Sequence, residues 1–90
     1  MVHIMKSKSN AKEISCGMAL TGIFKELDQF KYEDQKKDMI QLVEKTFKMK
    51  NVPEDYAQEM LDTLKSSSLK NGLKYIGNVV MAGMGLRANI

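Results

Sequence analysis

Apolar positions recur at helical spacing along most of this 90-residue chain, and most densely at residues 72–86. That run reads GLKYIGNVVMAGMGL and contains no acidic residue. Steps of three or four residues put Leu69, Leu73, Ile76, Val80 and Met84 on one face of a helix. Further apolar side chains widen the arc at Val79, Met81 and Ala82. A helix that is apolar over most of its circumference is buried on more than one side.

Four of the six glycines lie in this run, although a glycine inside a helix costs about 1 kcal/mol relative to alanine. These glycines would be explained if they let the backbone of a neighbouring helix approach closely. One interpretation is a core helix with a glycine-rich end; the other is a helix that binds a second copy or a partner. The residues expected to form that interaction helix are Gly72, Leu73, Ile76, Gly77, Val80, Met81 and Met84. Lys74 and Arg87 leave the run too short for a membrane span, which needs about 20 apolar residues.

The N-terminal half predicts two further helices. Asn10 and Glu13 have the spacing of a capping box, which predicts a helix from Ala11 to Phe30. Its buried face is expected to contain Ile14, Met18, Ala19, Phe24, Leu27 and Phe30, with Leu20 and Ile23 beside it. A second helix is predicted from Tyr32 to Lys50, with acidic residues in its first turn and lysines in its last.

A third helix is predicted to begin at Pro53, after a stop at Asn51. Three serines, Ser66 to Ser68, either end this helix and cap a fourth or lie inside one long helix. We favour the break, which makes residues 53–86 two helices.

The predicted fold is therefore all-α: a small helical hairpin or a three- to four-helix bundle, oligomeric through its Gly/Met-rich C-terminal helix. Residues 1–9 are expected to be a flexible N-terminal arm and residues 10–90 a single helical domain. The chain is 43% hydrophobic and 28% charged with one proline, a composition typical of helical globular proteins. So short a chain buries a modest fraction of its surface, which also favours association.

Composition argues against catalysis and points to the cytoplasm. The single histidine, His3, and the single cysteine, Cys16, are far apart in the sequence, and we find no pairing of a nucleophile with a base. No metal or cofactor motif is present, so no metal, cofactor or catalytic residue is expected. One cysteine permits no internal disulfide, which is typical of a reducing compartment.

The net charge is +3, and residues 65–90 contain four basic residues and no acid. This suits an anionic ligand or partner better than bulk nucleic acid, which needs a broader basic patch. A helix beginning near Ser68 would direct free N–H groups at the surrounding lysines and hydroxyls, an arrangement that binds phosphate. The residues expected at such a site are Lys65, Ser67, Ser68, Lys70, Asn71, Lys74 and Tyr75. The simpler interpretation is that the serines only cap a helix.

The stretch SSLKNGLKYIGNVVMAG, residues 67–83, resembles the last helix of the small phage proteins that sequester cyclic oligonucleotides in anti-CBASS defence. The shared positions are Ser67, Leu69, Gly72, Leu73 and Ile76. The resemblance implies a helical hairpin that assembles as an oligomer and holds an anionic nucleotide. It also implies a ligand-stacking tyrosine near the N-terminus, whereas no aromatic residue precedes Phe24 in this chain.

Two functions follow as expectations. The first is a non-enzymatic helical interaction protein that associates with itself and binds or inhibits another protein. The alternative is a binding module for a small, phosphate-bearing anionic ligand such as a nucleotide. Neither function involves a membrane.

Overall fold

The computed structural model describes the backbone of residues 2–84 and the side chains of residues 11–84. Within these residues the chain forms four α-helices, three short 3-10 turns and no strand. The elements in order are α1 (Val2–Leu20), η1 (Thr21–Ile23), η2 (Glu26–Gln29), η3 (Glu33–Gln35), α2 (Lys36–Met49), α3 (Glu54–Lys65) and α4 (Leu69–Gly83). The all-α fold class is confirmed. Residues 85–90 lie outside the described residues.

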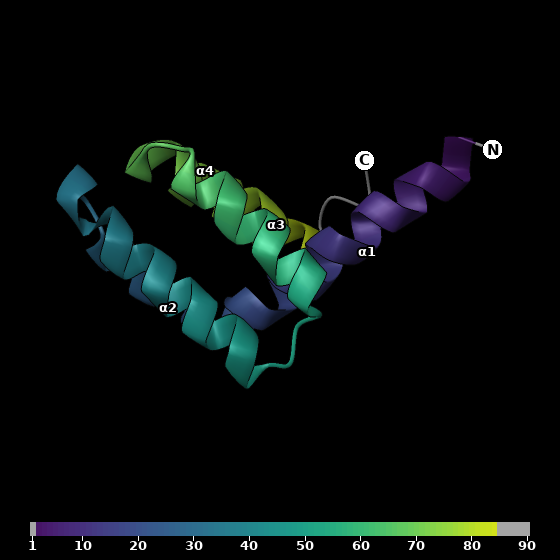
Figure 1. The fold of residues 1–90 in the computed structure, drawn as a ribbon, viewed down its shortest axis with the longest axis horizontal. Helices are drawn as coiled ribbons and strands as arrows, with labels where there is room; N and C mark the ends of the chain where they lie inside the picture. Colours follow the sequence, from purple (N-terminus) through teal and green to yellow (C-terminus); the bar gives the residue numbers. More distant parts are fainter. Residues whose placement is uncertain (1, 85–90) are drawn as a thin grey trace.

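Helix α1 enters from one end of the molecule, and its first turns project beyond the other helices (Figure 1). Helices α3 and α4 run in opposite directions on either side of the short turn at residues 66–68 (Figure 1). Helix α2 packs against α3, and α1 makes its most extensive contact with α4. The projection of α1 makes the molecule elongated, with extents of 43 × 26 × 23 Å.

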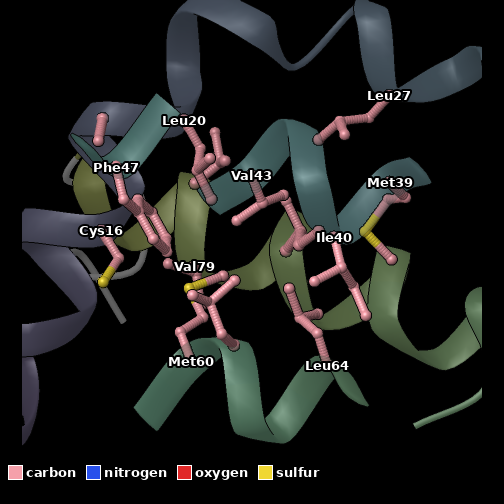
Figure 2. Packing of buried hydrophobic residues seen from close by; sticks show 14 of the residues in the cluster. Cys16, Leu20, Leu27, Met39, Ile40, Val43, Phe47, Met60, Leu64 and Val79 are labelled. Atoms are coloured by element: carbon pink, nitrogen blue, oxygen red, sulfur yellow. The ribbon is translucent and has the colours of Figure 1, made fainter. Parts of the chain in front are cut away.

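One hydrophobic core joins all four helices. Figure 2 shows side chains from α2 and α3, among them Val43, Met60 and Leu64, directed toward one another across the interior. Two methionines, Met39 and Met60, are fully buried, where their flexible side chains fill gaps. The complete cluster contains Cys16, Ala19, Leu20, Leu27, Phe30, Met39, Ile40, Val43, Phe47, Met60, Leu61, Leu64, Leu69, Ile76, Val79 and Val80.

The first helix differs from its prediction in both its bounds and its buried face. It begins at Val2 and ends at Leu20, and 3-10 turns follow where the sequence predicted helix. Residues 2–9, expected to be an arm, have the helical backbone of α1, and their mobility stays a prediction. Ile14 and Met18, expected in the core, are 41% and 61% exposed.

The buried face of α1 is rotated relative to the predicted one because glycines of α1 and α4 contact each other. A Cβ atom built on Gly17 would overlap the carbonyl oxygen of Val79, and one built on Gly83 would lie 2.5 Å from the backbone nitrogen of Met18. The two backbones therefore touch. Packing α1 on α4 along Gly17 turns its neighbours Cys16 and Leu20 inward and leaves Ile14 and Met18 outside.

The later helices follow the sequence prediction closely. Residues 33–35 form a 3-10 turn before α2, where a helix from Tyr32 was predicted. Asn51 ends the segment with a left-handed φ of 58°, a conformation that asparagine tolerates. Pro53 directly precedes α3 and is not its first residue. The break at the serines is confirmed, since Ser68 caps a separate helix α4 through a bond from the N–H of Asn71 (3.2 Å).

Candidate interaction face on helix α4

Helix α4 has one face that lies entirely within the protein's own core. Five of its residues are buried there: Leu69, Gly72, Ile76, Val79 and Val80. A Cβ atom on Gly72 would contact Leu64 and Met39 at 3.3 and 3.4 Å, so this glycine serves packing within the chain. Gly72, Ile76 and Val80, which were predicted to contact a partner, are thus buried within the protein's own fold. Their part in an interface stays a prediction.

The opposite side of α4, which we call the outer face, is formed by Lys70, Lys74, Gly77, Met81 and Met84. These positions are separated by four, three, four and three residues, which places them on one stripe of the helix. Met81 is 44% exposed and Met84 is 58% exposed. No heavy atom of the described residues outside the adjacent helix backbone lies within 4 Å of a Cβ built on Gly77. The outer face is thus basic at one end, methionine-rich at the other, and open at its centre.

Leu73 lies at the edge of the outer face and is half-buried. With Phe24, Leu27, Asp28 and Phe30 it lines a cavity of about 180 Å³. Phe24 is itself 45% exposed, although the sequence placed it in the core. Exposed apolar surface therefore continues from α4 onto the segment that follows α1.

The N-terminus of α4, predicted to bind an anion, is occupied by a carboxylate of the protein itself. The backbone N–H of Leu69 donates to Oε1 of Glu33 (2.9 Å), and the N–H of Asn71 donates to the hydroxyl of Ser68. Glu33 lies 36 residues earlier in the chain, so no local pattern revealed it. An incoming phosphate would have to displace this carboxylate.

The other groups predicted for that site are directed elsewhere. The Ser67 hydroxyl donates to the carbonyl of Thr63 (2.8 Å), and Lys36 Nζ donates to the carbonyls of Lys65 and Ser67 (3.0 and 2.8 Å). The side chains of Lys65, Lys70 and Lys74 are exposed. The turn between α3 and α4 is thus held by Glu33 and Lys36, two residues that sequence analysis did not assign to it.

Tyr75 lies on a different side of α4 from the lysines. Burial raises the pKa of its phenol, and the charges that act on it are those of Lys12, Glu13, Cys16 and Glu59. These residues belong to α1 and α3, so Tyr75 faces those helices. The structure therefore separates Tyr75 from Lys70 and Lys74, with which it was grouped.

Cys16 is buried and unsuited to act as a nucleophile. Its side chain is 1% exposed, its Sγ lies 3.9 Å from the carbonyl oxygen of Tyr56, and burial raises the pKa of the thiol to about 11. Beside it, Lys12 and Glu59 form an ion pair with an N–O distance of 3.0 Å, and the bond to Glu59 raises the pKa of Lys12. Since the thiolate is the reactive form, burial and the raised pKa both disfavour reaction at this cysteine.

A second cavity, of about 300 Å³, lies between the end of α2 and the start of α3, where the sequence predicted no site. The buried residues of its lining are apolar and the exposed ones are polar. The residues that line it are Glu44, Phe47, Lys48, Asn51, Val52, Glu54, Ala57, Gln58 and Leu61. The only sequence signal for it is the Asn51 turn, which separates the two helices at this end.

Metal-binding and membrane-crossing features are absent from the part of the chain that the structure describes. Across residues 11–84, no three His, Cys, Asp or Glu side chains come together as metal ligands would. None of the described helices has the length and hydropathy that crossing a bilayer requires.

Comparison with protein-family models, curated proteins and solved structures finds no match to this chain. The resemblance of residues 67–83 to the phage proteins therefore rests on its sequence pattern alone.

Replacing Glu33 by glutamine is expected to destabilise the protein by about 1 kcal/mol. The change weakens a charge-assisted bond at the N-terminus of α4 and removes the negative charge that the helix dipole favours there. Urea unfolding measures the loss. The matched control is Asp34→Asn, which removes the adjacent carboxylate and should change stability by less than about 0.5 kcal/mol. Equal effects of the two changes would contradict a specific role for Glu33.

Proposed function

We propose that this protein is a non-enzymatic helical interaction protein that associates with itself, and that the outer face of α4 is its contact surface. The observation that carries the proposal is the division of α4 into two faces. One face is buried in the core, while the other exposes Met81 and Met84 beside the open position of Gly77.

Methionine side chains adapt their shape to a partner, and burying them removes apolar surface from water. The lysines at the basic end of the outer face also favour a partner surface of a particular charge. Residues 63–84 contain Lys65, Lys70 and Lys74 and no acid, so a partner surface that is apolar or acidic fits better than a basic one. The same face could also bind another protein, which the protein would then occupy or inhibit. We place this activity in the cytoplasm on the ground of the single, unpaired cysteine.

The experiment is sedimentation equilibrium over a concentration series up to about 1 mM, where an association free energy of about 4 kcal/mol is still detected. The wild-type mass is expected to rise with concentration. The double variant Met81→Lys, Met84→Lys should stay monomeric, because it removes the apolar part of the outer face and adds four like charges to a contact that already contains Lys70 and Lys74. Circular dichroism should show an unchanged fold, since both side chains are exposed.

The matched control is Met49→Lys, which introduces the same change at a methionine on α2 that is 70% exposed. It should associate like the wild type. A wild-type mass that does not depend on concentration would refute self-association. A double variant that associates as well as the wild type would place the contact elsewhere.

The alternative, a site for a phosphate-bearing ligand at the start of α4, has weaker support. It would need the carboxylate of Glu33 to leave the N–H of Leu69, and the hydroxyl of Ser67 to turn from Thr63. Calorimetry with a nucleotide ligand and Lys70→Ala tests this alternative separately.

A further inference from the structure

We infer that the cavity between the end of α2 and the start of α3 binds a small arylalkylamine. The aromatic ring of this ligand would lie against the buried apolar residues of the lining, and its protonated amine beside the exposed carboxylates. The lining comes from α2, α3 and the turn between them, whereas the outer face belongs to α4. The inference is therefore independent of the proposed self-association and adds a second binding site.

The cavity exists because the turn between α2 and α3 separates the ends of these helices, which the loop in Figure 1 joins. Asn51 has a φ of 58°, and the next N–H, that of Val52, donates to the carbonyl of Phe47 (3.0 Å). Pro53 is then extended, with a φ of −52° and a ψ of 135°, so α3 does not continue from α2. The space left between the two helices has a volume of about 300 Å³.

The buried part of the lining suits an aromatic ring. Phe47 and Leu61 are 2% and 5% exposed, and Val52 and Ala57 are half-buried. An apolar cavity of about 150 Å³ is large enough to hold benzene. A cavity of about 300 Å³ can therefore hold a ring system roughly twice as large, such as an indole with a short chain. The aromatic ring of Phe47 is a favourable surface for such a ligand to pack against.

The exposed part of the lining favours a cation. Its charged groups are the carboxylates of Glu44 and Glu54 and the ammonium group of Lys48. Lys48 and Glu44 are both exposed and 4.0 Å apart, a pairing that holds each group only weakly. The carboxylate of Glu54 makes no hydrogen bond or ion pair with any residue from 11 to 84. A protonated amine would provide its counter-ion, whereas an anionic ligand would meet two like charges.

The start of α3 does not reverse this preference for a cation. The first backbone N–H groups of a helix together carry about half a positive charge. Glu54 and Asp55 lie in the first turn, and the N–H of Tyr56 already donates to Oδ1 of Asp55 (2.9 Å). The two carboxylates outweigh the partial charge of the helix end, so the cavity remains negative on this side.

A hydrogen-bond acceptor of the lining is also free to bind an ammonium group, which donates three hydrogen bonds and accepts none. The amide nitrogen of Gln58 donates to Oδ1 of Asp62 (2.9 Å). Because a carboxylate only accepts, the nitrogen of this amide must face Asp62, and the amide oxygen remains an acceptor. Gln58 therefore adds a neutral acceptor to the two carboxylates that line the cavity.

Titration followed by amide NMR spectroscopy tests the site, because it reports both the affinity and the residues affected. The probe is tryptamine, an indole ring on a short chain that ends in a protonated amine. Saturable shifts are expected at the amides of Asn51, Val52 and Ala57, with a dissociation constant below about 1 mM for a ligand of this size. Indolepropionate has the same ring and a carboxylate in place of the amine. It should bind about fivefold more weakly, which is the upper range for the effect of an ion pair at an exposed site.

Substitutions of exposed residues test the charge preference without disturbing the fold. Glu54→Gln should weaken tryptamine binding about threefold to fivefold. The matched control Asp55→Asn removes the neighbouring carboxylate, which does not line the cavity, and should leave binding unchanged. Lys48→Gln removes the ammonium group of the lining and should not weaken tryptamine binding. A further variant, Ala57→Leu, fills the cavity and should abolish the shifts while circular dichroism shows unchanged helicity.

The inference fails if tryptamine gives no saturable shifts, if the shifts lie at other residues, or if indolepropionate binds as tightly as tryptamine. Equal effects of Glu54→Gln and Asp55→Asn would also overturn it, because the amine would then not lie beside Glu54. Each of these results would leave the proposed self-association standing, since the titration is made at a dilution at which the protein is monomeric.

Discussion

Replacing Gly17 by alanine is expected to destabilise the protein by about 3 kcal/mol, the upper part of the range for adding atoms to a packed interior. The added Cβ would overlap the carbonyl of Val79 and lie 3.0 Å from the backbone nitrogen of Gly83. Both neighbours are backbone atoms, which cannot rotate away as the end of a side chain can. Helices α1 and α4, which share the most extensive contact in the fold, would have to separate.

Thermal unfolding measures this loss, because for a chain of this size each kcal/mol lowers Tm by about 4–8 °C. The matched control is Gly77→Ala in the same packed pair of helices. There the new methyl group meets open space, and the change should stabilise the monomer by about 1 kcal/mol through helix propensity. If Gly17→Ala were as stable as Gly77→Ala, the backbone contact between α1 and α4 would not exist in solution.

The same substitution should strongly destabilise the protein at one residue of α4 and leave its stability almost unchanged at the next. Val80 is 2% exposed, so Val80→Glu would bury a carboxylate without a partner and remove a packed side chain. We expect a loss of more than about 4 kcal/mol, which is comparable with the whole stability of a small domain. Met81 is 44% exposed, and Met81→Glu should leave the stability of the monomer within about 0.5 kcal/mol of the wild type.

Urea unfolding followed by circular dichroism compares the pair at a dilution at which the wild type is monomeric. The difference in stability between the two variants shows which face of α4 is buried. A change at position 80 should affect folding, whereas a change at position 81 should affect association. Equal stability of the two variants would show that the inner face is not buried as described, and the division of α4 on which the proposed function rests would be lost.

Local signals in the sequence predicted most of the helical elements. The turn at Asn51 and Pro53, the cap at Ser68 and the periodicity of α4 each depend on residues a few positions apart, so they can be recognised without the fold. The apolar content of α4 predicted burial on more than one side, whereas the folded chain buries one face and leaves Met81 and Met84 exposed.

Signals that depend on distant residues were missed. Ile14 and Met18 have helical spacing, as do Cys16 and Leu20, and nothing local decides which pair faces inward. Likewise, Glu33 and the N–H of Leu69 meet only because the 3-10 turn before α2 lies against the start of α4. The anion site predicted from Ser68 and the lysines did not include this internal carboxylate.

The amino-acid sequence by itself determined that the chain is helical and where α2, α3 and α4 are separated, because capping and periodicity act over one or two turns. Only the tertiary structure decided which glycines serve the protein's own packing. Gly17 and Gly83 bring α1 onto α4, whereas Gly77 is left facing open space. The physical reason is that a glycine has no side chain with which to mark its own environment, so its role is set by the backbone that folding places against it.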